Sequence, residues 1–94
     1  SGLVEKHHSD RVRELLFALA KLLSDLDEED FKQSKIEENV RSTLKEGDAT
    51  LGDVAQACRV ALTGREVSPG LFATMELLGK EKTISRLQHF AELN

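Results

Sequence analysis

Apolar residues recur at helical spacing along the whole chain, and no segment alternates with a period of two for long enough to form a strand. The first apolar stripe predicts a helix over about 10–24, with Ser9 or Asp10 as its cap. Its members follow one another at intervals typical of one helix face: Val12, Leu15, Leu16, Leu19, Leu22, Leu23 and Leu26. The pattern therefore predicts an all-α fold.

Three of the four further helices are marked by capping residues at their starts and glycines at their ends. The predicted segments are Ser34 (with Glu37) to Gly47, Thr50 (with Asp53) to Gly64, Ser68-Pro69 to Gly79, and a last helix over about 80–92. The acidic connector between Asp25 and Asp30 is expected to be a solvated loop. The sequence thus predicts an irregular bundle of about five short helices.

The length of 94 residues allows a single domain, 1–94, in which Ser1 and Gly2 look like the scar of a cleaved tag. Apolar residues make up 39% of the chain, which is enough for one modest core. The net charge of −4 argues against a polycation that coats nucleic acid or acidic lipid. Residues 59–90 nevertheless hold five basic and three acidic residues, so a polyanion is expected to bind there if it binds anywhere.

Cys58 is the only cysteine, so no internal disulfide is possible and a cytoplasmic location is expected. The longest apolar run, Leu15 to Ala20, is far shorter than the roughly 20 residues of a membrane span, and no membrane partner is expected. Phosphate loops, zinc-binding cysteine pairs and nucleophile motifs are all missing, and no metal or cofactor site is expected. An independent enzyme is therefore disfavoured.

One stretch combines features that suit recognition of a nucleic acid. Between Arg59 and Phe72 the sequence predicts a helix end, a glycine turn, a short polar loop and a capped helix start. Unpaired N–H groups at a helix start can bind a phosphate or a base edge, and Arg59 and Arg65 add guanidinium groups. Leu71 and Phe72 could supply an apolar platform for an unstacked base. An ordinary helix hairpin remains the alternative.

The same stretch resembles the C-terminal anticodon-binding region of bacterial glutamyl-tRNA synthetases, which are class I enzymes. The resemblance is carried by three segments in register over about residues 51–87: Arg59-Val-Ala-Leu-Thr-Gly64, Ser68-Pro-Gly-Leu-Phe72, and Glu76-Leu-Leu-Gly-Lys-Glu81 with Arg86-Leu87. It implies an α-helix cage that grips the anticodon loop of tRNA(Glu). The RNA-binding residues that it implies are Arg59, Thr63, Ser68, Pro69, Leu71 and Phe72; Arg65 lies between them at a loop position expected to vary, and is a lower-ranked candidate.

The resemblance also implies that the chain is an excised part of a larger enzyme, expected to be monomeric, that joins glutamate to tRNA. ATP and Mg²⁺ would bind the catalytic domain of that enzyme, whose signatures are missing here, so this fragment should hold no cofactor and be inactive alone. Structural roles remain open for several residues. Thr63 can bond back to its own helix, Ser68 and Pro69 can serve only as a cap, and one of Leu71 and Phe72 is expected to face the core. A helical protein-interaction domain without an RNA role is the alternative function.

Overall fold

Five α-helices and one short 3₁₀ helix form the part of the chain that the computed structural model describes, residues 9–65 and 70–93. Their bounds are α2 Asp10–Asp25, η1 Glu28–Asp30, α3 Gln33–Glu46, α4 Leu51–Thr63, α5 Leu71–Leu78 and α6 Lys80–Glu92. No strand occurs in these ranges. The prediction of an all-α bundle of about five helices is confirmed.

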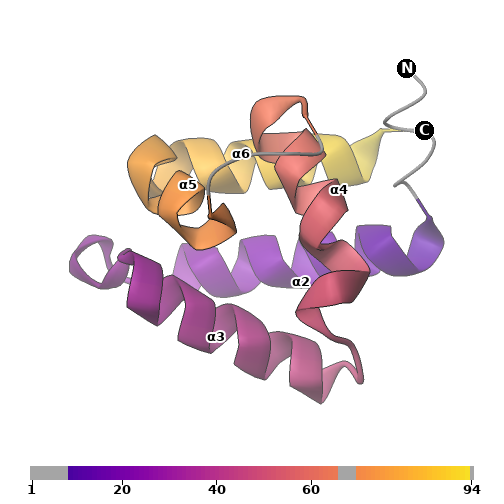
Figure 1. Cartoon of the computed structure of the whole chain (residues 1–94), viewed down its shortest axis with the longest axis horizontal. Coiled ribbons are helices and arrows are strands. Elements are labelled where there is room, and N and C mark those ends of the chain that lie inside the picture. Colours follow the sequence, from indigo (N-terminus) through magenta and orange to yellow (C-terminus); the bar gives the residue numbers. More distant parts are fainter. Residues whose placement is uncertain (1–8, 66–69, 94) are drawn as a thin grey trace.

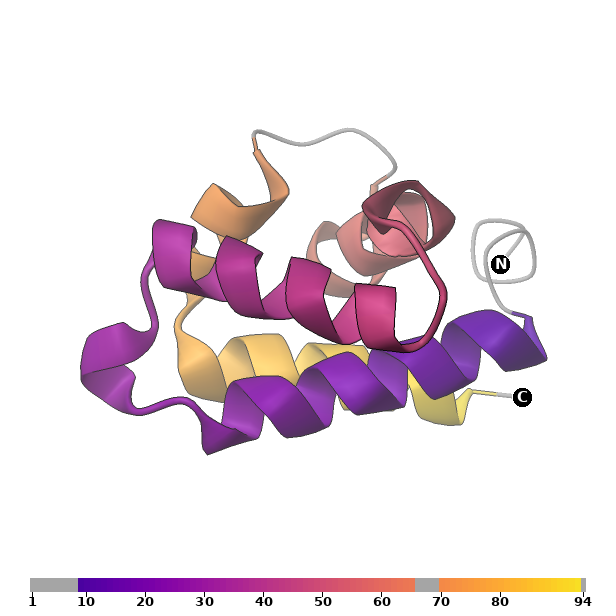
Figure 2. The ribbon, with the colours of Figure 1, turned by 90° about the horizontal axis from the view of Figure 1, so that it is seen from below.

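The helices are arranged in two layers (Figures 1 and 2). α2 and α6 run antiparallel, side by side, and form one layer with the most extensive helix contact in the molecule. α3, α4 and α5 cover this pair on one side, with α4 crossing it steeply and packing on both α2 and α6. α5 contacts α3, α4 and α6, so this shortest of the described α-helices touches both layers.

Each helix turns its apolar stripe into one shared core. The buried side chains include Leu16, Leu19 and Leu23 of α2, Ile36, Val40 and Leu44 of α3, Val54, Cys58 and Leu62 of α4, Leu71, Phe72 and Met75 of α5, and Leu87, Phe90 and Ala91 of α6. Phe31, from the connector before α3, is also buried. No helix in the described ranges is long and apolar enough to cross a membrane.

The ends of the helices follow the predicted signals in most places. The Ser9 side chain caps α2 by accepting from the N–H of Val12, and Thr50 and Asp53 form the expected capping box. Gly64 ends α4 in the left-handed conformation with φ 77°. Gly79 lies between α5 and α6 with φ 91° and ψ 163°, a conformation that is open almost only to glycine. Gly64 at the end of α4 and Gly79 between α5 and α6 therefore adopt backbone conformations that residues with a Cβ rarely adopt.

Three predicted boundaries are wrong. The acidic connector is not all loop, because Glu28–Asp30 form a 3₁₀ turn. Ser34 does not start the next helix: α3 begins at Gln33 after Lys32, and the Glu37 carboxylate pairs with Arg41 Nε at 2.9 Å instead of closing a capping box. α5 begins at Leu71 with Gly70 as its N-cap, so its start lies after the predicted Ser68-Pro69 signal. Ser68 and Pro69 themselves lie outside the described residues.

Candidate nucleic-acid interface

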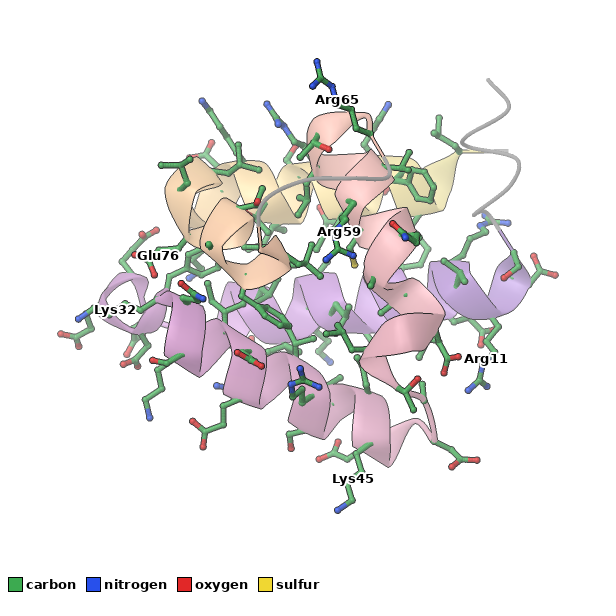
Figure 3. The ribbon with its side chains drawn as sticks, in the orientation of Figure 1. Arg11, Lys32, Lys45, Arg59, Arg65 and Glu76 are labelled. Carbon is green, nitrogen blue, oxygen red and sulfur yellow. The ribbon has the colours of Figure 1, made fainter. Side chains whose placement is uncertain are left out.

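Arg59 lies on the third turn of α4, between the buried residues Cys58 and Val60. Its side chain is half-buried, and Figure 3 shows it on the face of the molecule where α4 and α5 approach each other. The guanidinium group has no hydrogen bond or ion pair within residues 9–65 and 70–93. A half-buried charge without a protein partner is available to an anionic or polar ligand.

The end of α4 is held by side-chain hydrogen bonds from Thr63. Its hydroxyl donates to the carbonyl of Arg59 at 2.7 Å and accepts from the N–H of Arg65 at 3.2 Å. Thr63 therefore has the structural role that the sequence left open, in addition to any role in binding. Arg65 follows the glycine turn, and its exposed side chain points outward from the end of α4 (Figure 3). The Arg65 guanidinium also lacks a partner among the described residues.

The start of α5 offers backbone donors rather than an apolar platform. Its first intrahelical hydrogen bond runs from the N–H of Thr74 to the carbonyl of Gly70, and Gly70 supplies no side-chain cap. The N–H groups of Leu71, Phe72 and Ala73 therefore have no acceptor in the described part of the chain. Such N–H groups, with the partial positive charge of the helix start, suit an anion or a base edge.

The expectation that one of Leu71 and Phe72 faces the core and the other the loop is wrong. Both are buried, with exposed fractions of 4% and 7%. The physical reason is that α5 packs against three helices at once, so both side chains find a neighbouring helix to pack against. Neither side chain can stack on a base without leaving the core.

Two of the basic residues counted in 59–90 are already used inside the fold. Arg86 Nη1 donates to the carbonyl of Leu62 at 2.6 Å, and Lys80 Nζ donates to the carbonyl of Leu26. Both cations donate to carbonyls at the C-terminal ends of helices, where the helix dipole favours a positive charge. Fewer basic side chains of this segment are therefore available to bind a ligand than the sequence count suggests.

Cys58 is not a nucleophile in this fold. Its side chain is fully buried, and this burial raises the pKa of the thiol from 9.0 to about 12, against a smaller lowering by the charge of Arg59. The thiolate is the reactive form of cysteine, so the group is inert at neutral pH. No cluster of three or more potential metal ligands occurs in the described ranges.

We expect an alkylating reagent to label Cys58 only when the protein unfolds. The unfolded thiol ionises near pH 9.0 and the folded one near 12, so the unfolded state loses its proton first, and stability should fall as the pH rises through this window. Iodoacetamide labelling at pH 8, followed by mass spectrometry with and without urea, checks the first point. Because Cys58 is the single cysteine, rapid labelling of the native protein would contradict the burial directly.

In the described residues the structure is a small helical domain, in which an arginine without a partner among those residues and a helix start that Gly70 does not cap lie on the same face. A comparison with known proteins defines it further: the chain belongs to the anticodon binding domain family, whose model matches residues 2–91.

The related proteins are glutamate–tRNA ligases. The chain is 42% identical over 89 residues to the enzyme of Legionella pneumophila (strain Corby) and 40% identical over 91 residues to one from Koribacter versatilis. These matches cover 95% and 96% of this chain but 18% of each relative. The chain thus spans less than a fifth of the length of these relatives. The resemblance predicted from residues 51–87 is confirmed and extends over nearly the whole chain.

The fold is similar to that of a solved relative. The crystal structure of a glutamate tRNA ligase from Elizabethkingia meningosepticum in complex with its amino acid superposes with a TM-score of 0.85 at 29% identity. The match covers 98% of this chain and 18% of that one. The predicted helical architecture of the anticodon-binding type is therefore confirmed.

Proposed function

We propose that this domain reads the anticodon loop of tRNA(Glu) as the C-terminal module of a glutamate–tRNA ligase. The observation that carries the proposal is the half-buried guanidinium of Arg59, which has no partner among the described residues and lies on the same face as the start of α5, where Gly70 supplies no side-chain cap. Both groups donate hydrogen bonds and carry positive charge, so together they suit unstacked bases and the phosphates between them. Arg65, just after the end of α4, would add a further donor group, since its side chain points outward (Figure 3).

The chemistry of the parent enzyme would take place elsewhere. The whole ligase would attach glutamate to tRNA with ATP and Mg²⁺ bound in its catalytic domain, as a cytoplasmic monomer. This domain would contribute recognition alone and should be inactive by itself. Thr63 would support the site by fixing the turn that presents Arg65, and Leu71 and Phe72 would act through their backbone N–H groups. Ser68 and Pro69 stay in the proposed site from the family resemblance alone.

The alternative of a protein-interaction domain requires an exposed apolar groove. In the described ranges the exposed large apolar side chains are Phe17 and Leu77, which belong to helices of different layers. Isolated apolar side chains of this kind are common on soluble proteins and do not define a docking surface. The RNA-binding function is therefore the better supported one.

An NMR titration of the labelled chain with an anticodon stem-loop of tRNA(Glu), at low salt, tests the proposal. We expect amide shifts confined to about residues 59–72, because the free donors lie there, and we expect none with a stem-loop whose loop sequence is scrambled. The low salt is needed because an acidic domain with few phosphate contacts binds weakly. Equal shifts with both loops, or none with either, would contradict anticodon reading by this domain.

A further inference from the structure

We infer that Glu76 is a positioning residue for the RNA site: its carboxylate caps α3 and thereby sets where the start of α5 lies relative to Arg59. This inference rests on the proposed function. It starts from a contact between two helices that are far apart in the sequence. Glu76 Oε1, on α5, accepts a hydrogen bond of 2.5 Å from the backbone N–H of Gln33, the first residue of α3.

Within the described ranges, the start of α3 has no other side-chain cap. Lys32 occupies the N-cap position without a side-chain hydrogen bond, and the first turn of α3 holds no acidic residue. A carboxylate at this end is favoured both by the orphan N–H groups and by the helix dipole. Glu76, on α5, therefore supplies the acidic cap that the first turn of α3 lacks. The two helices are joined by a charge-assisted hydrogen bond.

A second polar contact fixes the same part of α5 to α6. The hydroxyl of Thr83, which is fully buried, donates to the carbonyl of Met75 at 3.1 Å. Met75 and Glu76 are consecutive, so the last turns of α5 are anchored to α6 on one side and to α3 on the other. The first turn of α5 has no such polar anchor to another helix among the described residues; Leu71 and Phe72 hold it by apolar packing.

Because α5 is short, the contacts of Met75 and Glu76 near its C-terminal end also determine the position of its N-terminal end. Eight residues span about 12 Å, and a helix of two turns moves as one piece. Loss of the Glu76 contact would free α5 to tilt about its remaining anchor at Met75. Such a tilt displaces the N–H groups of Leu71 and Phe72 from Arg59, which stays on α4. Glu76 would thus affect RNA binding without touching the RNA.

Whether Glu76→Ala weakens or strengthens RNA binding distinguishes a positioning role from a purely electrostatic one. Removal of a negative charge strengthens binding of a polyanion if charge alone matters. We expect the opposite for Glu76→Ala, about a fivefold weaker affinity for the tRNA(Glu) anticodon stem-loop, the factor that corresponds to one capping interaction. Glu76→Gln makes the same change of charge but keeps an oxygen that accepts from Gln33, so its affinity should stay within about twofold of wild type.

Fluorescence anisotropy with the labelled stem-loop, at several salt concentrations, measures these affinities. Glu81→Ala is the matched control, because Glu81 is an exposed acid at the start of α6 and has no partner in the described part of the chain. It should bind as wild type or more tightly. The dependence of the affinity on salt should be unchanged in Glu76→Ala, since no phosphate contact is lost. Circular dichroism confirms that each variant is folded.

The outcomes are distinguishable. Wild-type affinity or better in Glu76→Ala would overturn the positioning role while leaving the proposed function intact, and so would a Glu76→Gln variant as weak as Glu76→Ala. Failure of the wild-type protein to prefer the correct loop would overturn the proposed function and the inference with it. Faster amide exchange at Gln33 in Glu76→Ala than in Glu76→Gln would support the cap itself.

Discussion

The Arg59→Glu variant should lose at least about tenfold in affinity for the tRNA(Glu) anticodon stem-loop while keeping its helical circular dichroism spectrum. An arginine that contacts a base or phosphate contributes about 1–3 kcal/mol, and a glutamate in its place adds repulsion from the RNA. The fold should tolerate the change because the Arg59 guanidinium has no hydrogen bond or ion pair in the described ranges. Anisotropy for binding and thermal unfolding for stability measure the two effects.

Lys21→Glu is the control for this experiment. Lys21 is an exposed residue of α2, in the layer opposite α4 and α5, and it undergoes the same change of charge. If the general charge of the domain governs binding, both variants weaken it alike. If Arg59 makes a specific contact, Lys21→Glu should cost less than about twofold at moderate salt. Equal losses in the two variants would contradict the role assigned to Arg59.

The parts of the fold that sequence predicted well depend on local chemistry. The helix starts at Ser9 and Thr50 are closed by side chains at most three residues away, so their signals lie within one short window. The ends at Gly64 and Gly79 need positive φ values, which glycine adopts without strain. Such features do not depend on the rest of the chain.

The features that sequence missed are made by residues far apart. The cap of α3 comes from Glu76, 43 positions beyond Gln33, and no pattern around Ser34 could indicate that another helix would displace the local capping box. Arg86 and Leu62 are likewise 24 positions apart. Contacts of this kind follow from how helices pack, and tertiary packing overrides local preference.

In the candidate site, too, local features could be predicted from the sequence and features that depend on helix packing could not. The pattern of Arg59, Gly64 and a following helix start can be recognised in the sequence because it lies within one short window, and its RNA-binding role stays a prediction. The inward orientation of both Leu71 and Phe72 was not, because it depends on the three helices that surround α5. The buried hydroxyl of Thr83 was also missed, since a single threonine within an apolar stripe carries no signal of its partner, the Met75 carbonyl.

Leu16→Ala should lower the free energy of unfolding by about 3 kcal/mol and the melting temperature by about 12–24 °C. Leu16 is fully buried on α2, the helix that makes the most extensive contact in the fold, with α6. Truncation removes one methine and two methyl carbons from the core and leaves a cavity that packed helices fill only in part. Urea unfolding monitored by circular dichroism measures the free energy, and a thermal scan measures the midpoint.

The neighbouring residue provides the control for this variant. Phe17 is 41% exposed and lines an open surface hollow with Asp10, Arg13 and Glu14, so Phe17→Ala should cost less than about 1 kcal/mol although it removes more atoms. At 10 °C the Leu16→Ala protein should still be mostly folded, and its affinity for the stem-loop should then equal that of wild type, because Leu16 belongs to the layer opposite Arg59 and α5. Similar losses of stability in the two variants would contradict the burial pattern. A loss of RNA affinity in fully folded Leu16→Ala would show instead that the α2–α6 layer determines the shape of the site and does more than support it.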